Sequence, residues 1–158
     1  MTLEEKRAKL SALLAKDPGQ LSGRDGLQDL GLTIDYATGL ADSAALQQAV
    51  ERATALWPTL ADAKDVAEFH FFLGNAWDEL CYLRRAADGL SWEWKQSELE
   101  EANRSFRAAQ ASDGFACLHR YRQCQVLTNI GNHFDRVGRS QRYRRLVLSV
   151  ALTQRGAK

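Results

Sequence analysis

The 158-residue sequence has few residues that interrupt helices and no long apolar run. Only two prolines occur, Pro18 and Pro58, and β-branched residues are scarce outside residues 126–150. Alanine, leucine, arginine and glutamate are plentiful, and these residues favour the α-helix. No apolar run approaches the roughly 20 residues that a membrane-spanning helix needs, and the mixed-charge N-terminus is typical of neither a signal peptide nor a transit peptide. We therefore expect an all-α protein of the cytoplasm with no membrane contact.

Cysteine is too sparse and too irregularly spaced to predict a disulfide framework or a metal centre. Cys81, Cys117 and Cys124 contain no CxxC spacing, and in a cytoplasmic protein we expect reduced, buried thiols. A zinc site can be drawn from Cys117, Cys124, His119 and His133, but this spacing matches no common zinc motif. No nucleophile, base and orienting group combine into a catalytic set. The sequence therefore predicts neither an enzyme nor a metal or other cofactor.

Acidic residues are absent from the end of the chain. The formal net charge is only +1, yet every charged residue after Asp135 is basic: Arg136, Arg139, Arg142, Arg144, Arg145, Arg155 and Lys158. Arginine clusters neutralise phosphates, so Arg142, Arg144 and Arg145 are candidate nucleic-acid contacts. The alternative is a solvated face or a contact with a protein partner, since only Tyr143 is available nearby to stack on a base.

Apolar residues spaced three and four apart predict a series of helices joined by short turns. Thr2 and Glu5 form a capping-box pattern at the first of them. The predicted helices cover about 2–16, 43–57, 62–88, 97–111, 115–137 and 140–154, with Gly138 as the break before the last. Residues 19–41 are rich in glycine and are predicted to be a loop with at most a short helical turn. One helical domain, 1–158, then consists of an N-terminal helix and loop (1–41), a core (42–137) and a basic capping helix (138–158).

A short phrase recurs within the predicted core. Leu73-Gly74-Asn75 is followed by Trp77, and Ile130-Gly131-Asn132 is followed by Phe134. A small residue lets a second helix approach closely, and aromatic rings fill the space around it. Gly74 and Gly131 are therefore predicted to lie where helices approach each other. The helix after the first phrase has small, aromatic and small residues at Ala102, Phe106 and Ala109.

This combination resembles the tetratricopeptide repeat (TPR). In that motif helix A carries a large residue, Leu-Gly and an aromatic, and helix B carries Ala, an aromatic and Ala. The match covers residues 66–137, although the two glycines lie farther apart than one repeat unit, which implies long helices and an enlarged linker at 89–96. The resemblance implies stacked antiparallel helix pairs, that is, a short α-solenoid with elongated helices. Past Gly138 the pattern fails.

Three stretches are similar to a particular group of TPR proteins. FHFFLGNAWDEL, WEWKQSELEEANRSFRAA and RQCQVLTNIGNHFDRVGR resemble the TPR-containing N-terminal region of bacterial HEPN-type abortive-infection proteins. This resemblance implies a bacterial defence or stress context. In that family an RNase activity would belong to a separate C-terminal HEPN domain with an Arg-x4–6-His motif, and none of His70, His119 and His133 follows an arginine at that spacing. The resemblance thus implies the interaction region without the nuclease, and an unrecognised hydrolase is a further alternative.

The repeated asparagine predicts a binding groove. The resemblance implies that helix A faces line a concave groove for peptides, and the residues expected there are Phe71, Asn75, Asp78, Tyr82, Asn129, Asn132 and Arg136. An amide both donates and accepts, so asparagine suits the backbone of an extended peptide. The alternative is that each asparagine bonds within the protein. Only Arg136 clearly opposes the acids Asp78 and Glu79, so a C-terminal carboxylate is not the expected ligand.

Two further features stay open at this point. Trp92 and Trp94 in the linker either form an exposed contact patch or fold back over the helix pair. The sequence predicts a protein or peptide partner, but it leaves the identity of the partner and the oligomeric state undetermined.

Overall fold

The computed structural model shows a helical chain. It describes the backbone of residues 1–89 and 96–155 and the side chains of residues 1–89 and 97–139, and no strand occurs in these ranges. The elements, in chain order, are α1 (Leu3–Leu14), η1 (Pro18–Gln20), α2 (Gly23–Gly39), α3 (Ser43–Leu56), η2 (Trp57–Thr59), α4 (Ala63–Ala87), α5 (Gln96–Ala111), η3 (Phe115–Cys117) and α6 (Arg120–Arg155). The prediction of an all-α fold is confirmed. Among the described helices, none combines the length and apolar character needed to cross a membrane.

The starts of α1 and α3 follow from their capping residues. The capping box at α1 is confirmed, because Thr2 Oγ1 accepts from the Glu5 amide at 3.2 Å and the Glu5 carboxylate accepts from the Thr2 amide at 2.7 Å. α3 begins at Ser43, and the residue before it is the cap. The Asp42 side chain accepts from the Ala45 amide at 2.9 Å and satisfies one of the first free N–H groups.

The predicted loop at residues 19–41 is wrong, because most of it forms α2. Its buried residues Leu27, Leu30, Ile34 and Ala37 follow the spacing of three and four that builds a helix face. Two of its glycines serve close packing, and neither marks a turn. A Cβ at Gly26 would come within 2.8 Å of Leu56 Cδ1, and a Cβ at Gly31 would come within 2.6 Å of the Phe72 ring.

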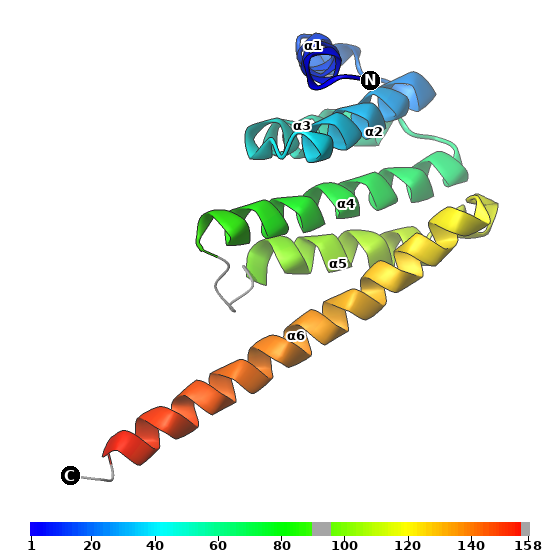
Figure 1. Cartoon of the computed structure of the whole chain (residues 1–158). Helices are drawn as coiled ribbons and strands as arrows, with labels where there is room; N and C mark the ends of the chain where they lie inside the picture. Colours follow the sequence, from blue (N-terminus) through cyan, green and yellow to red (C-terminus); the bar gives the residue numbers. More distant parts are fainter. Residues whose placement is uncertain (90–95, 156–158) are drawn as a thin grey trace.

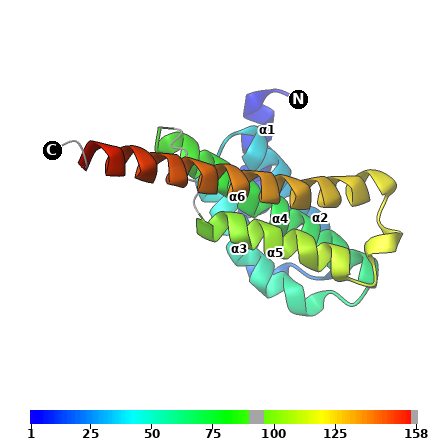
Figure 2. The ribbon, with the colours of Figure 1, turned by 90° about the horizontal axis from the view of Figure 1, so that it is seen from below.

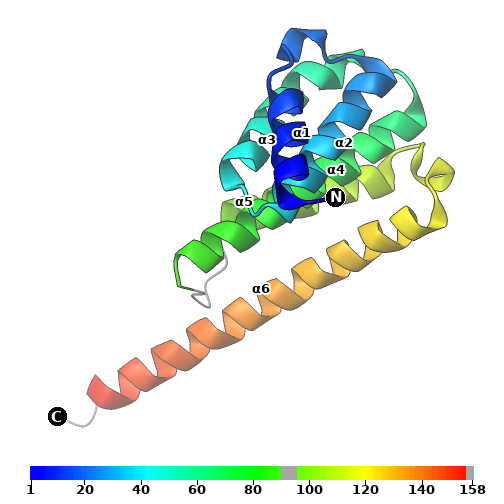
Figure 3. The ribbon, with the colours of Figure 1, turned by 45° about the horizontal axis from the view of Figure 1, so that its top comes forward.

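The helices stack in chain order, with α1 at one end and α6 at the other (Figure 1). α2 packs against α3 and α4, and α3 packs against α4. The most extensive packing joins α4 to α5. α6 packs against α5 and, seen from below, crosses in front of α4 and α5 (Figure 2). α1 covers part of the α2–α3 pair on the side of the stack away from α6 (Figure 3).

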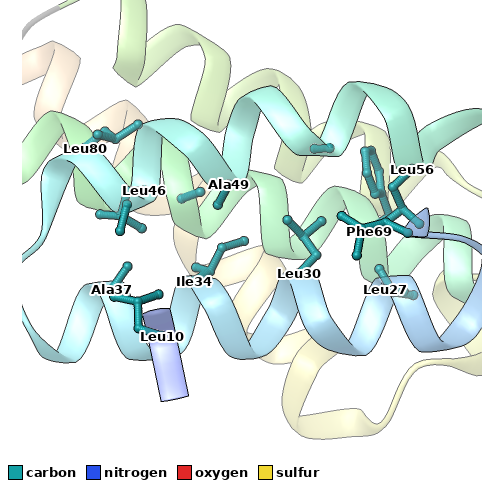
Figure 4. Close-up of a cluster of buried hydrophobic side chains, with 14 residues drawn as sticks. Leu10, Leu27, Leu30, Ile34, Ala37, Leu46, Ala49, Leu56, Phe69 and Leu80 are labelled. Carbon is teal, nitrogen blue, oxygen red and sulfur yellow. The ribbon is translucent and has the colours of Figure 1, made fainter. Parts of the chain in front are cut away.

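The buried apolar side chains form two clusters. The first joins α1, α2, α3 and α4, and Figure 4 shows its main members: Leu10, Leu27, Leu30, Ile34, Ala37, Leu46, Ala49, Leu56, Phe69 and Leu80. The second joins α4, α5 and α6 through Phe71, Ala102, Phe106, Ala109 and Val126. Phe72 and Trp77 of α4 pack against both clusters. α4 is therefore the central helix of the molecule.

The two glycines of the repeated phrase have different surroundings. Gly74 is buried where a Cβ would come within 2.6 Å of the Phe106 ring of α5, so the predicted close approach is confirmed. Gly131 is exposed, and a Cβ there would meet no atom within 4 Å, so the same prediction is wrong for Gly131. The reason is the orientation of α6, which turns Val126 and Ile130 toward the second cluster.

The predicted break at Gly138 is also wrong. α6 runs without interruption from Arg120 to Arg155, so residues 138–155 of the proposed capping helix continue the helix before them. One glycine costs a helix only about 1 kcal/mol relative to alanine, and no proline follows it. The 36 residues extend over about 54 Å at about 1.5 Å per residue, and the C-terminal end projects beyond the other helices (Figures 1 and 2).

Candidate binding surface

One side of α4 carries polar and aromatic groups between α2 and α6. At 3.6 residues per turn, the residues on this side are Asp65, Glu68, Phe72, Asn75, Glu79 and Tyr82. Glu68 is buried, Asn75 and Glu79 are half-buried, and Tyr82 is 51% exposed. Ion pairs to α2 and α6 fix the position of this side of α4 within the molecule. We call this side of α4, with the α2 and α6 residues that flank it, the binding surface.

Glu68 connects three helices through its carboxylate. One oxygen accepts from Arg24 of α2 at 2.6 Å, and the other accepts from Arg122 of α6. Arg24 also donates to Asp65, and these bonds raise the pKa of Arg24, with Asp65 as the larger cause. Both oxygens of Glu68 are therefore bonded to cations, as a buried carboxylate requires.

Arg122 is held by aromatic rings as well as by charge. Its guanidinium carbon lies 4.8 Å from the centroid of the Phe72 ring and 5.1 Å from that of Phe71. A guanidinium over a ring face at this distance is attracted by the quadrupole of the ring. Arg122 is thus fixed in direction at the place where α6 begins to cross α4.

A hollow of about 330 Å³ opens beside these ion pairs. It lies between α2, α4 and the start of α6, and it is lined by Arg24, Leu27, Gln28, Gly31, Leu32, Asp35, Glu68, Phe72 and Arg122. Asp35 is exposed at its mouth. Partial loss of water around this carboxylate raises the pKa of Asp35, while the nearby charge of Arg122 acts to lower it.

A second ion pair joins α4 to α6 farther along both helices. Arg136 donates to Asp78, and the two side chains are only about a quarter exposed, at 26% and 29%. Asn75 lies between Glu68 and Asp78 on α4, and Asn129 lies between Arg122 and Arg136 on α6. Beside Asp78, the loss of water and then the neighbouring negative charge raise the pKa of Glu79.

The three asparagines that were predicted to line the groove form no side-chain hydrogen bonds with other described residues. Asn75 and Asn129 are half-buried and Asn132 is exposed, and none of the three side chains forms a hydrogen bond within the part of the chain that the structure describes. The alternative, that each asparagine bonds within the protein, therefore finds no support among the described residues.

The predicted placement of Phe71 on the open face is wrong. Its side chain is only 4% exposed and belongs to the second cluster, with its ring centroid 6.5 Å from that of Phe106. One residue corresponds to about 100° around a helix, so the neighbouring Phe72 points toward α2 and the hollow instead. Tyr82, in contrast, is an exposed residue of α4.

Several other predictions fall on residues outside the description. The side chains of Arg142, Arg144 and Arg145 and those of Trp92 and Trp94 are not among those described, so the proposed nucleic-acid contacts and linker patch stay predictions. The predicted burial of the cysteines is confirmed for Cys81 and wrong for Cys117 and Cys124, which are exposed, as is His119. In the described ranges, no group of three or more His, Cys, Asp or Glu side chains could hold a metal ion.

Comparison with protein-family models, with curated proteins and with solved structures found no match. The surface is therefore interpreted through its chemistry: amides that donate and accept, aromatic rings, and charges that are fixed by ion pairs.

Sequence reasoning missed Arg24, Asp35, Glu68, Phe72 and Arg122. The two ion pairs of Glu68 join residues that are 44 and 54 positions apart, and no local sequence pattern predicts such distant partners. One signal was available for α2. Leu27, Leu30-Gly31 and Ile34 repeat the spacing of Leu127, Ile130-Gly131 and Phe134, so the phrase occurs a third time without its asparagine and with an isoleucine in place of the aromatic residue.

Proposed function

We propose that this chain is a non-catalytic scaffold that binds an extended segment of a protein partner along the binding surface. The observation that carries the proposal is the set of three asparagine amides, Asn75, Asn129 and Asn132, that the described fold leaves without hydrogen bonds beside two ion pairs. An extended peptide presents alternating N–H and C=O groups, and an amide side chain can bond both kinds.

The proposal includes a TPR-like pairing of helices. In this pairing α2 and α3 form one unit, α4 and α5 form the next, and α6 supplies the first helix of a third. Support comes from the order of packing, in which α3 contacts α4 and α5 contacts α6. The Leu-Gly or Ile-Gly step also recurs within α2, α4 and α6. The binding surface would then consist of the first helix of each unit.

The test uses peptides selected from a displayed library of unconstrained random sequences against the full chain. Binding of the selected peptides is measured by fluorescence anisotropy for wild type, Asn75→Ala and Asn132→Ala. Each lost amide leaves a peptide group without its partner, which costs about 1–3 kcal/mol, or about fivefold to 150-fold in affinity. The thermal midpoint should stay close to that of wild type, because neither asparagine belongs to an apolar cluster, and substitutions away from such contacts usually change stability by no more than about 0.5 kcal/mol.

Gln110→Ala is the matched control, since this amide is exposed on α5 outside the binding surface. It should leave peptide affinity unchanged. A large fall in midpoint with unaltered affinity in the Asn75 and Asn132 variants would show that the asparagines are structural. Failure to select any peptide whose binding depends on this surface would contradict the proposed function itself.

A further inference from the structure

The hollow beside Glu68 has an apolar floor. Gly31 contributes only backbone there, and a Cβ in its place would collide with the Phe72 ring at 2.6 Å. Leu32, at the mouth, is 43% exposed, which is high for a leucine beside a well-packed helix pair. A ring, a helix backbone and an exposed leucine offer an apolar stem a surface on which to lie.

The ion pairs around the hollow leave one of its carboxylates without a bonded cation. Arg24 and Arg122 are both bonded to Glu68, and Arg24 is also bonded to Asp65. Asp35, which also lines the hollow, forms no hydrogen bond or ion pair with any described residue. The lining thus holds two guanidinium groups and two carboxylates, and both guanidinium groups are bonded to Glu68, so Asp35 is the carboxylate of the lining that has no bonded cation.

We propose, resting on the proposed function, that the hollow binds one basic side chain, lysine or arginine, of the partner segment. The alkyl stem lies over Leu32 and the Phe72 ring, and the cationic head bonds the carboxylate of Asp35. An acidic side chain is disfavoured, because the carboxylates of Asp35 and Glu68, which both line the hollow, repel it. A purely apolar side chain fills the floor but leaves Asp35 without a partner.

The experiment uses side-chain analogues, so it does not need the natural partner. The full chain, labelled with ¹⁵N, is titrated with N-acetyl-lysine amide, N-acetyl-arginine amide, N-acetyl-norleucine amide and N-acetyl-glutamate amide. The backbone amide of Gly31 reports occupancy. We expect saturable shifts with both basic analogues, about tenfold weaker binding of norleucine because it lacks a charge-assisted hydrogen bond, and no saturable shift with glutamate.

Asp35→Asn should remove the preference for the basic analogues over norleucine while leaving norleucine binding as it was. Asp25→Asn is the control, because it makes the same change on an exposed acid of the same helix that does not line the hollow. The inference is overturned if glutamate binds more tightly than lysine, if no analogue shifts Gly31, or if Asp35→Asn keeps the preference. Selected peptides that need Asn75 yet bind Asp35→Asn as tightly as wild type would overturn this inference alone and leave the proposed function standing.

Discussion

Gly74 and Gly131 occupy equivalent positions in the repeated phrase, but their contacts predict opposite responses to the same substitution. Gly74 lies against Phe106, which is only 2% exposed and has no room to move. Gly74→Ala should therefore lower the free energy of unfolding by about 1–3 kcal/mol. In a chain of this size the thermal midpoint should fall by about 2–4 °C for each kcal/mol, as measured by circular dichroism.

Gly131→Ala provides the matched comparison. The new methyl group meets no atom within 4 Å, and replacing a helical glycine by alanine gains up to about 1 kcal/mol. The midpoint should stay the same or rise. A loss of stability as large as that of Gly74→Ala would mean that another helix covers Gly131 in solution.

At the scale of single residues, the sequence predicts positions on a helix better than it predicts partners. Asn75 and Tyr82 could be assigned to one face of α4 because the helical period sets the direction of a side chain. Phe71 was misplaced by the same reasoning, since it lies at the edge of that face and the second cluster covers it. The bonds of Glu68 could not be predicted, because both partners come from other helices.

At the scale of elements, the sequence predicts α1, α3, α4 and α5 because their apolar spacing and end signals agree. It fails for α2, where several glycines suggest a loop. Glycine does lower helix propensity, but Gly26 and Gly31 are buried at contacts that a larger residue would block. The gain from close packing is a tertiary effect, and it outweighs the local preference that sequence reasoning measures.

The basic end of α6 allows a test of the nucleic-acid alternative. We expect only weak binding of single-stranded RNA, with affinity that falls steeply as salt rises from low to physiological concentration, because arginine contacts with phosphate release counterions. Replacing Arg142, Arg144 and Arg145 by glutamine should abolish this binding in a filter or anisotropy assay. Tight binding that persists at physiological salt would favour the nucleic-acid function over the protein scaffold.

At the scale of the whole molecule, Glu68 holds α2, α4 and α6 in one arrangement. Glu68→Gln replaces a buried charge with a neutral amide and leaves Arg24 and Arg122 less compensated. Their side chains are 45% and 31% exposed, so water relieves part of this loss. We expect the free energy of unfolding, measured by urea denaturation, to be about 1–3 kcal/mol lower than that of wild type.

Glu101→Gln makes the same chemical change at the surface. Its pair with Arg104 is formed within α5, and the two side chains are 37% and 69% exposed. Such pairs contribute about 0–1 kcal/mol, so this variant should unfold close to wild type. Equal destabilisation by the two substitutions would argue against a special role for the junction at Glu68.

The position of α4 in both apolar clusters has a consequence for how the chain loses its structure. Phe72 and Trp77 pack on both sides of this helix, so unfolding of either half exposes apolar surface belonging to the other. Two separate cores would open independently, whereas two cores that share a helix lose stability together. The stack between α2 and α5 is therefore one cooperative unit.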